Sequence, residues 1–194
     1  MNYLFFDTET NGLPKSWKAP MTDVDNWPRI IQFAYILMDE KQNVISQDCR
    51  LITPDGWVIP EEKFWQDNGY STQKNAEEGV SLDWVFDDFI DCLEKSKAIV
   101  AHNMSFDYNV VGAEMIRYKR SGPKLEKICT MKSSIDLCKL LPVRFGSFKF
   151  PKLEELHTHL FGCSFDGAHD ALEDVRATAR CFFEMKKLGI EFKY

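Results

Sequence analysis

Residues 2–12, with the sequence NYLFFDTETNG, constrain the fold more than any other part of the chain. The apolar run at 3–6 predicts a strand that is buried on both faces. Asp7 and Glu9 follow at alternate positions, and side chains two residues apart in a strand point to the same face, about 7 Å apart. Two like charges at the rim of a core repel each other and lose hydration, unless a cation lies between them or one takes up a proton. The segment therefore predicts that other groups of the chain meet these two acids.

The composition is typical of one globular domain, which we expect to span residues 1–194. No run approaches the roughly 18 uninterrupted apolar residues of a membrane helix. The first residues, MNYLFFDTE, lack the basic region and long apolar stretch of a secretion signal. The 6 cysteines show no C-x-x-C spacing and lie mostly in apolar segments, which favours reduced, packed thiols. These features together predict a cytoplasmic protein.

The charge balance limits how the chain can bind nucleic acid. A net charge of -6 argues against a protein that grips long duplex DNA through many phosphates, because that mode needs an excess of Lys and Arg. Divalent cations held by acidic residues would reverse the local field at their site. An acidic chain can therefore still receive one end of a nucleic acid strand.

The order of apolar patterns predicts an α/β architecture. Runs at 30–38 and 44–52 are expected to form antiparallel strands, and a further short strand is expected at 98–101. The spacing of apolar residues after Ser81 predicts an amphipathic helix with this serine as its cap. Further helices are expected at about 61–66, 105–119, 133–140, 152–161 and 168–188.

Two more acids and a histidine occupy helix starts. Asp107 is expected in the first turn of the helix at 105–119, where an ionised carboxylate gains about 0.3 to 1 kcal/mol, so ordinary capping would explain it. His169 and Asp174 fall in the segment FDGAHDALEDVRAT. If both were helical they would lie about 140° apart, so their convergence needs His169 in an entry loop, which Gly167 favours. Taken singly, each of these signals is weak, since a lone histidine is more often a satisfied core or surface residue.

Together and in this order, the segments FFDTETNGL, IVAHNMSFD and GAHDALEDVRAT resemble the three motifs of the DEDDh exonucleases. This family includes ribonuclease T, oligoribonuclease and the proofreading subunit of bacterial DNA polymerase III. The resemblance covers residues 3 to about 187. It implies an α/β, ribonuclease H-like fold with a central mixed β-sheet and helices on both sides, forming a single exonuclease domain.

The resemblance also implies a two-metal mechanism. His169 would act as general base, since an unperturbed pKa near 6.5 suits proton transfer at neutral pH. Hard oxygen ligands suit Mg²⁺ or Mn²⁺, and two such ions can stabilise the attacking and leaving oxygens of an in-line displacement. The ligands implied for two divalent ions are Asp7, Glu9, Asp107 and Asp174.

The implied substrate is the 3' end of single-stranded DNA, released as 5'-mononucleotides. Phe106 would stack on a base, a contact worth roughly 1 to 3 kcal/mol, although core packing is an equal alternative for Phe106 and Leu13. One segment departs from the family, because relatives often carry a His-Gly-Ile-Thr-like sequence where this chain has Asn68 and the three residues after it. The residues implied to seat the terminal nucleotide are Thr8, Thr10, Leu13 and Phe106.

Several alternatives stay open. The same chemistry would serve a 3'-5' exoribonuclease that trims RNA tails or short oligoribonucleotides, since contacts to the 2'-hydroxyl cannot be read from sequence. A nuclease-like module could bind nucleic acid ends without cutting, and a homodimer or a polymerase partner is compatible with the chain. A structural zinc site is disfavoured, because positions i and i+2 of a helix diverge and no tight cysteine pair is present. Its ligands would be Cys129, His157, His159 and Cys163.

Overall fold

The computed structural model describes residues 1–142, 146, 148–167 and 170–194. Its strands form one five-stranded sheet in the order β3-β2-β1-β4-β5. The pairs β3/β2 and β2/β1 are antiparallel, whereas β1/β4 and β4/β5 are parallel. The mixed α/β sheet implied by the family resemblance is therefore confirmed. The strands are β1 (Asn2–Thr10), β2 (Ile30–Asp39), β3 (Val44–Leu51), β4 (Ala98–Ala101) and β5 (Glu126–Cys129).

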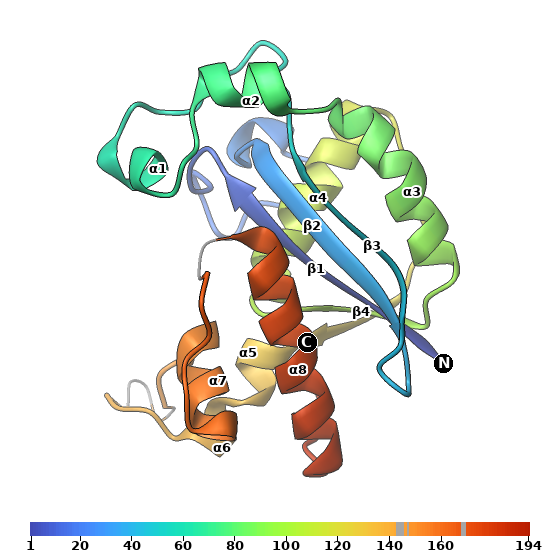
Figure 1. Cartoon of the computed structure of the whole chain (residues 1–194), viewed down its shortest axis with the longest axis vertical. Helices are drawn as coiled ribbons and strands as arrows, with labels where there is room; N and C mark the ends of the chain where they lie inside the picture. Colours follow the sequence, from blue (N-terminus) through green and yellow to red (C-terminus); the bar gives the residue numbers. More distant parts are fainter. Residues whose placement is uncertain (143–145, 147, 168–169) are drawn as a thin grey trace.

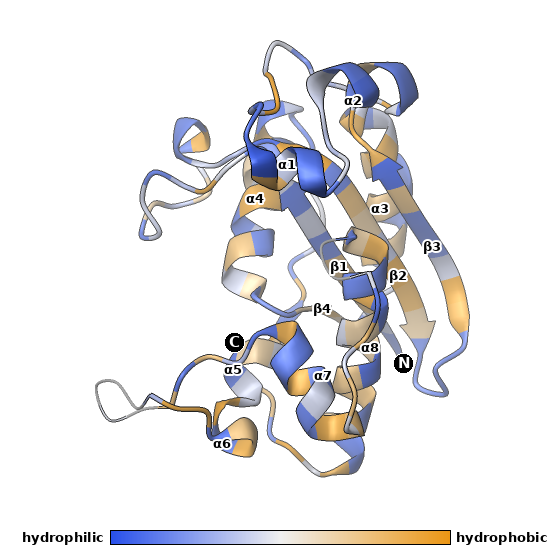
Figure 2. Ribbon diagram, turned by 60° about the vertical axis from the view of Figure 1, so that its left-hand side comes forward, coloured by the Kyte–Doolittle hydropathy of each residue, from blue (hydrophilic) through white to orange (hydrophobic). Residues whose placement is uncertain are grey.

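Helices lie on both faces of this sheet (Figure 1). Helices α3 and α4 pack on one face, α8 packs on the other, and α1 and α2 lie near the end of the sheet toward which β1 runs. Figure 2 shows that β2, between β1 and β3, is hydrophobic along most of its length. The helices are η1 (Val24–Asn26), α1 (Lys63–Asp67), α2 (Thr72–Glu78), α3 (Leu82–Glu94), α4 (Met104–Arg117), α5 (Thr130–Ser133), α6 (Ile135–Cys138), α7 (Leu153–Phe161) and α8 (Ala171–Lys187).

The two faces of β1 belong to different halves of the core. Leu4 and Phe6 pack with α3 and α4, whereas Tyr3 and Phe5 pack with α8. Because side chains alternate along a strand, the α8 face continues at positions 7 and 9 and the α4 face continues at position 8. The sequence of β1 therefore directs its two acids toward α8 and Thr8 toward α4.

Several elements differ from those expected. Strand β1 continues through Thr10, and both β5 and α2 lack the apolar periodicity that would have predicted them. The helix expected at 133–140 is split into α5 and α6. Ser81 precedes α3 as expected, but its side chain makes no capping hydrogen bond. The last helix begins at Ala171, and the start expected at residue 168 lies outside the described residues.

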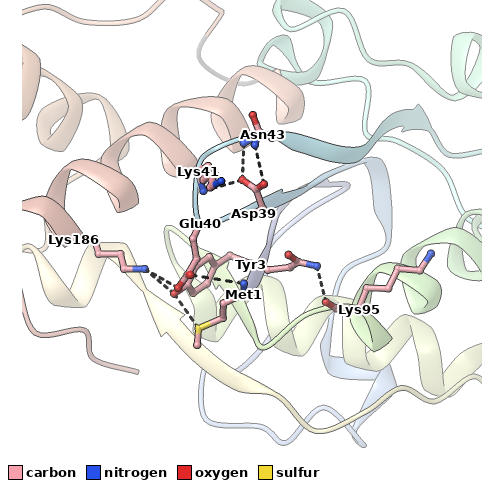
Figure 3. A network of polar contacts seen from close by, with 9 residues as sticks. Met1, Tyr3, Asp39, Glu40, Lys41, Asn43, Lys95 and Lys186 are labelled. Atoms are coloured by element: carbon pink, nitrogen blue, oxygen red, sulfur yellow. Dashed lines mark hydrogen bonds and ion pairs between the residues drawn. The ribbon is translucent and has the colours of Figure 1, made fainter.

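The end of the sheet at which β1 starts is held by polar contacts at the molecular surface (Figure 3). The Nζ of Lys186 donates a 2.9 Å hydrogen bond to the hydroxyl of Tyr3 and lies 3.7 Å from a carboxylate oxygen of Glu40. Asp39 accepts hydrogen bonds from the backbone nitrogens of Lys41 and Asn43, at 2.8 and 2.9 Å. These contacts tie the C-terminal part of α8 to the start of β1 and to the β2–β3 turn. Among the described residues, we find no helix long and apolar enough to traverse a bilayer.

Candidate active site

Three carboxylates meet where β1 ends and α8 begins. Asp7 and Glu9 lie on the α8 face of β1, and Asp174 lies in the first turn of α8. One oxygen from each group can be chosen so that all three lie within 4.8 Å of one another. This is the distance range in which several carboxylates can share a bound cation.

Asp107 approaches the same strand from α4. Its side chain is only 3% exposed, and its Oδ1 accepts hydrogen bonds from the backbone nitrogen of Thr8 at 3.2 Å and from the Thr8 hydroxyl at 2.8 Å. The pairing of β1 with β4 extends only to Phe5, opposite Val100, so the Thr8 N–H beyond it has no β4 partner. Asp107 satisfies this donor, because α4 starts directly after β4 and brings its first turn to the unpaired edge.

The electrostatics of the cluster show that its negative charges are poorly compensated. Burial, followed by Asp107, Asp174 and Glu9, raises the pKa of Asp7 well above its usual value. Burial and then Asp174 raise the pKa of Glu9 to about 8. Burial raises the pKa of Asp107 to about 7, against the opposing effect of the two Thr8 hydrogen bonds. A group of hard carboxylate oxygens that resists ionisation in this way fits divalent cations, which would neutralise the repulsion.

Gln32 connects this cluster to α8, although it lies outside the three sequence motifs. It lies opposite Glu9 in the β1–β2 pair and is buried. Its Oε1 accepts a 3.0 Å hydrogen bond from the backbone nitrogen of Ala171, and its Nε2 lies 3.4 Å from Oδ2 of Asp170. A glutamine inside the apolar run IIQFAYIL was the available sequence signal, because a buried polar side chain needs partners.

Asp170 and Tyr70 complete the support of α8. Asp170 caps the helix by accepting hydrogen bonds from the backbone nitrogens of Leu172 and Glu173, at 3.0 and 3.3 Å. The hydroxyl of Tyr70 donates a 2.6 Å hydrogen bond to Oε1 of Gln32. The aspartate could have been found as a helix N-cap, whereas nothing in the sequence singled out the tyrosine.

The segment that departs from the family therefore contributes Tyr70. Asn68, which the sequence analysis set against a histidine of the family, directly follows α1 and donates a 2.8 Å hydrogen bond to the carbonyl of Phe64 in that helix. Asn68 closes a helix end, while the tyrosine two residues later reaches the core beside the acids.

The residues expected to seat the terminal nucleotide lie around the end of β1. Thr8 is buried, and the hydroxyl of Thr10 donates a 2.7 Å hydrogen bond to the carbonyl of Gly12. Leu13 is 74% exposed, which argues against the core-packing alternative for this residue. Phe106 is partly buried against the α3–α4 side of the core and also contacts the Trp17 ring.

Two other expectations concern histidines. His169, the expected general base, lies outside the described residues. His157 is buried, and its Nδ1 lies 2.8 Å from the carbonyl oxygen of Cys163. In the described part of the chain, the grouping of potential metal ligands is that of Asp7, Glu9 and Asp174, and the cysteines and histidines considered for zinc form none.

The mixed sheet, the helices on its two faces and the acidic cluster define the class: an α/β protein of ribonuclease H-like fold with carboxylates suited to divalent metal. Within this class, the family model described as Exonuclease matches residues 4–182, and the chain belongs to this family. The resemblance to DEDDh exonucleases is thereby confirmed. A comparison with curated proteins finds no match.

Solved structures share the fold at low sequence identity. Exonuclease I from E. coli, in complex with a dT13 oligonucleotide, is 23% identical with a TM-score of 0.70, and the match covers 95% of this chain and 41% of that one. Exonuclease I from Methylocaldum szegediense is 23% identical with a TM-score of 0.70, covering 96% of this chain and 40% of that one. The nuclease domain of 3'hExo, a DEDDh family member bound to rAMP, is 16% identical with a TM-score of 0.69, covering 100% and 96%. The chain thus spans about two fifths of the Exonuclease I chains and nearly all of the 3'hExo domain.

Proposed function

We propose that this protein is a metal-dependent 3'-5' exonuclease that removes 5'-mononucleotides from the 3' end of single-stranded DNA. The observation that carries the proposal is the meeting of Asp7, Glu9 and Asp174 within 4.8 Å. Asp107 adds a fourth carboxylate, fixed by Thr8 on the neighbouring edge of the same strand. Family membership over residues 4–182 supports the same conclusion.

The four carboxylates would hold two divalent ions, Mg²⁺ or Mn²⁺. When bound, such a pair stabilises both the entering and the leaving oxygen of an in-line displacement at phosphorus. The protein's own contribution is to preorganise the ligands. Thr8 orients Asp107, and the bonds of Gln32 and Asp170 to the first turn of α8 set the position of Asp174.

His169 would supply the general base. Its imidazole would accept a proton from the water that attacks the last phosphodiester, as the P–O3' bond breaks. The products would be a 5'-mononucleotide and a strand shortened by one residue with a new 3'-hydroxyl. Only the neutral imidazole can accept this proton, so cleavage should weaken at acidic pH.

An exoribonuclease is the second candidate, with the same chemistry. It is supported by the match to the 3'hExo domain, which covers 96% of that domain, in a structure bound to rAMP. The DNA proposal is supported by the match to Exonuclease I in complex with dT13. The distinction depends on contacts to the 2'-hydroxyl.

The test compares oligothymidylate with oligouridylate of equal length, each labelled at its 5' end, in Mg²⁺ and in Mn²⁺. The proposal predicts stepwise shortening from the 3' end, faster for the DNA strand. Faster shortening of the RNA strand would select the exoribonuclease. Retention of both strands intact in a stable complex would instead indicate an end-binding module.

The cysteines bear on where the protein acts. All six are free, which supports a reducing compartment, and on that basis we propose a cytoplasmic location.

A further inference from the structure

The loop between β1 and β2 has a fixed shape. Asn26, which is buried, exchanges two hydrogen bonds with Ser16: the backbone nitrogen of Ser16 donates to Asn26 Oδ1 at 2.7 Å, and Asn26 Nδ2 donates to the carbonyl of Ser16 at 3.0 Å. The backbone nitrogen of Lys15 donates to the carbonyl of Asn26 at 3.1 Å. The indole N–H of Trp27 donates to the carbonyl of Pro20 at 3.1 Å. These bonds hold the two sides of the loop together on both sides of residue 17.

This loop presents Trp17 beside the candidate active site. Its ring lies 5.8 Å from the ring of Phe106, centroid to centroid, at an interplanar angle of 44°. Phe106 directly precedes Asp107, the carboxylate bound by Thr8. The Trp17 side chain is nevertheless 58% exposed, so most of its aromatic surface faces outward. A large indole left open next to acidic metal ligands offers a surface for another ring.

The charges around Trp17 favour a polyanion. Lys15 and Lys18 flank it in the sequence, and both are exposed. Over the part of the chain that the structure describes, no ion pair engages either lysine. In a chain with a net charge of -6, two unpaired ammonium groups on either side of an exposed indole form a local cationic and aromatic patch. Single-stranded nucleic acid is bound by this combination, in which bases stack on aromatic rings and phosphates meet cations.

We propose that Trp17 is a stacking site for a base of the single strand, on the 5' side of the nucleotide held at the carboxylates, with Lys15 and Lys18 facing the neighbouring phosphates. This inference rests on the proposed function, because the exonuclease site fixes which end of the strand enters. The loop leaves β1 directly after Thr10, on the strand that carries Asp7 and Glu9. Stacking of this kind accepts any base, which suits an enzyme that degrades strands of any sequence.

The test measures binding separately from cleavage. In the Asp7→Asn background, which should leave the strand intact, the affinity for a 5'-fluorescent dT8 is measured by anisotropy in Mg²⁺. Trp17→Ala is compared with Trp17→Phe, which keeps a ring, and with Trp84→Ala, which removes a tryptophan of 49% exposure located on α3. We expect Trp17→Ala to weaken binding by about 5- to 150-fold, as for the loss of one base stack, and the other two variants to stay near the parent protein.

A second arm locates the base. A set of dT8 strands, each with one abasic position, is measured against the parent protein and against Trp17→Ala. We expect one abasic position, upstream of the 3'-terminal nucleotide, to weaken the parent but to have no further effect on Trp17→Ala. Equal losses for both proteins at every position, or parent-like affinity of Trp17→Ala for dT8, would overturn the stacking site. Stepwise cleavage by the protein with Asp7 intact would in that case leave the exonuclease proposal standing, whereas absence of both binding and cleavage would overturn the two together.

Discussion

The hydroxyl of Tyr70 lies 2.6 Å from Oε1 of Gln32 in a buried hydrogen bond. The same oxygen accepts the backbone N–H of Ala171, so the segment before α2, the strand β2 and the start of α8 are joined at one atom. Asp174 lies in the first turn of that helix. The tyrosine is therefore linked through Gln32 to the start of α8, the helix that carries Asp174, and we expect it to help position this carboxylate.

The variant Tyr70→Phe removes this donor and keeps the ring. We expect the free energy of unfolding to fall by about 0.5 to 1.5 kcal/mol, the usual contribution of one hydrogen bond. We expect kcat to fall by about 10- to 100-fold with little change in KM, since residues that orient metal ligands have effects of this size. Steady-state kinetics and urea denaturation measure the two effects. Tyr194→Phe, at an exposed tyrosine, is the matched control, and a kcat for Tyr70→Phe equal to that of the wild type would contradict this role.

Thr8→Val tests the support of Asp107. Valine keeps the size of the side chain and the backbone N–H but removes the hydroxyl that donates at 2.8 Å. We expect the Mg²⁺ concentration for half-maximal activity to rise by about 10- to 100-fold, because the carboxylate loses a bond that orients it and favours its charged form. A metal titration of the initial rate measures this shift. The exposed Thr22→Val should leave the titration unchanged, and an unshifted curve for Thr8→Val would refute the prediction.

The cluster also predicts how stability depends on pH when metal is removed. The pKa of Glu9 is raised to about 8 and that of Asp107 to about 7, whereas such groups titrate near pH 4 in an unfolded chain. Between these values the folded protein binds protons that the unfolded chain has released, so stability falls as the pH rises. In EDTA we expect the melting temperature to decrease from about pH 5 to pH 8.

Added Mg²⁺ should flatten this dependence, because cations compensate the carboxylates in their ionised form. The measurement is a pair of thermal melting series, one in EDTA and one in excess Mg²⁺. Glu9→Gln, which removes one of the raised groups, should show a shallower decrease in EDTA than the wild type. Parallel series with and without metal would contradict the assignment of the cluster as a metal site.

A buried ion pair joins Glu114 of α4 to Arg29, which precedes β2, and predicts a large effect of mutation on stability. Oε1 of Glu114 accepts a 2.8 Å hydrogen bond from Arg29, lies 3.1 Å from a guanidinium nitrogen of Arg117 and receives the backbone N–H of Ile30 at 3.2 Å. Glu114→Ala leaves these groups without their acceptor and should lower the free energy of unfolding by about 3 to 5 kcal/mol. Lys63→Ala, which breaks an exposed ion pair with Asp67, should cost at most about 1 kcal/mol. Chemical denaturation of both variants measures these free energies. A loss of stability in Glu114→Ala as small as that in Lys63→Ala would count against a stabilising role of the buried ion pair.

The central part of the fold could be predicted from the sequence, because it depends on the local pattern of apolar residues. The continuous apolar run at the start of β1 and the spacing of apolar residues in α3 both predicted the elements that form. Strand β5 was missed because its four residues, EKIC, are half polar and become a strand only by pairing with β4. Such an element is determined by its neighbours and not by its own composition.

The candidate site, too, could be predicted from the sequence only in part. The same-face placement of Asp7 and Glu9 follows from strand geometry, and the structure brings Asp174 to them. Gln32 and Tyr70 could not be connected from sequence, because their hydrogen bond joins residues 38 positions apart that only the folded chain places together. A polar residue inside a buried strand was a signal that some partner existed, without indicating which one.

The most direct test measures mononucleotide release from strands labelled at the 3'-terminal nucleotide, for the wild type, for Asp7→Ala and for the exposed Asp67→Ala as control. With Mg²⁺ or Mn²⁺, the wild type and the control should release labelled 5'-mononucleotide, and EDTA should stop both. Asp7→Ala should release none while keeping the circular dichroism spectrum and melting behaviour of a folded protein, because the substitution removes a mutually repelling acid and leaves the core intact. Release by Asp7→Ala at the wild-type rate would contradict the assignment of the carboxylate cluster as the catalytic site.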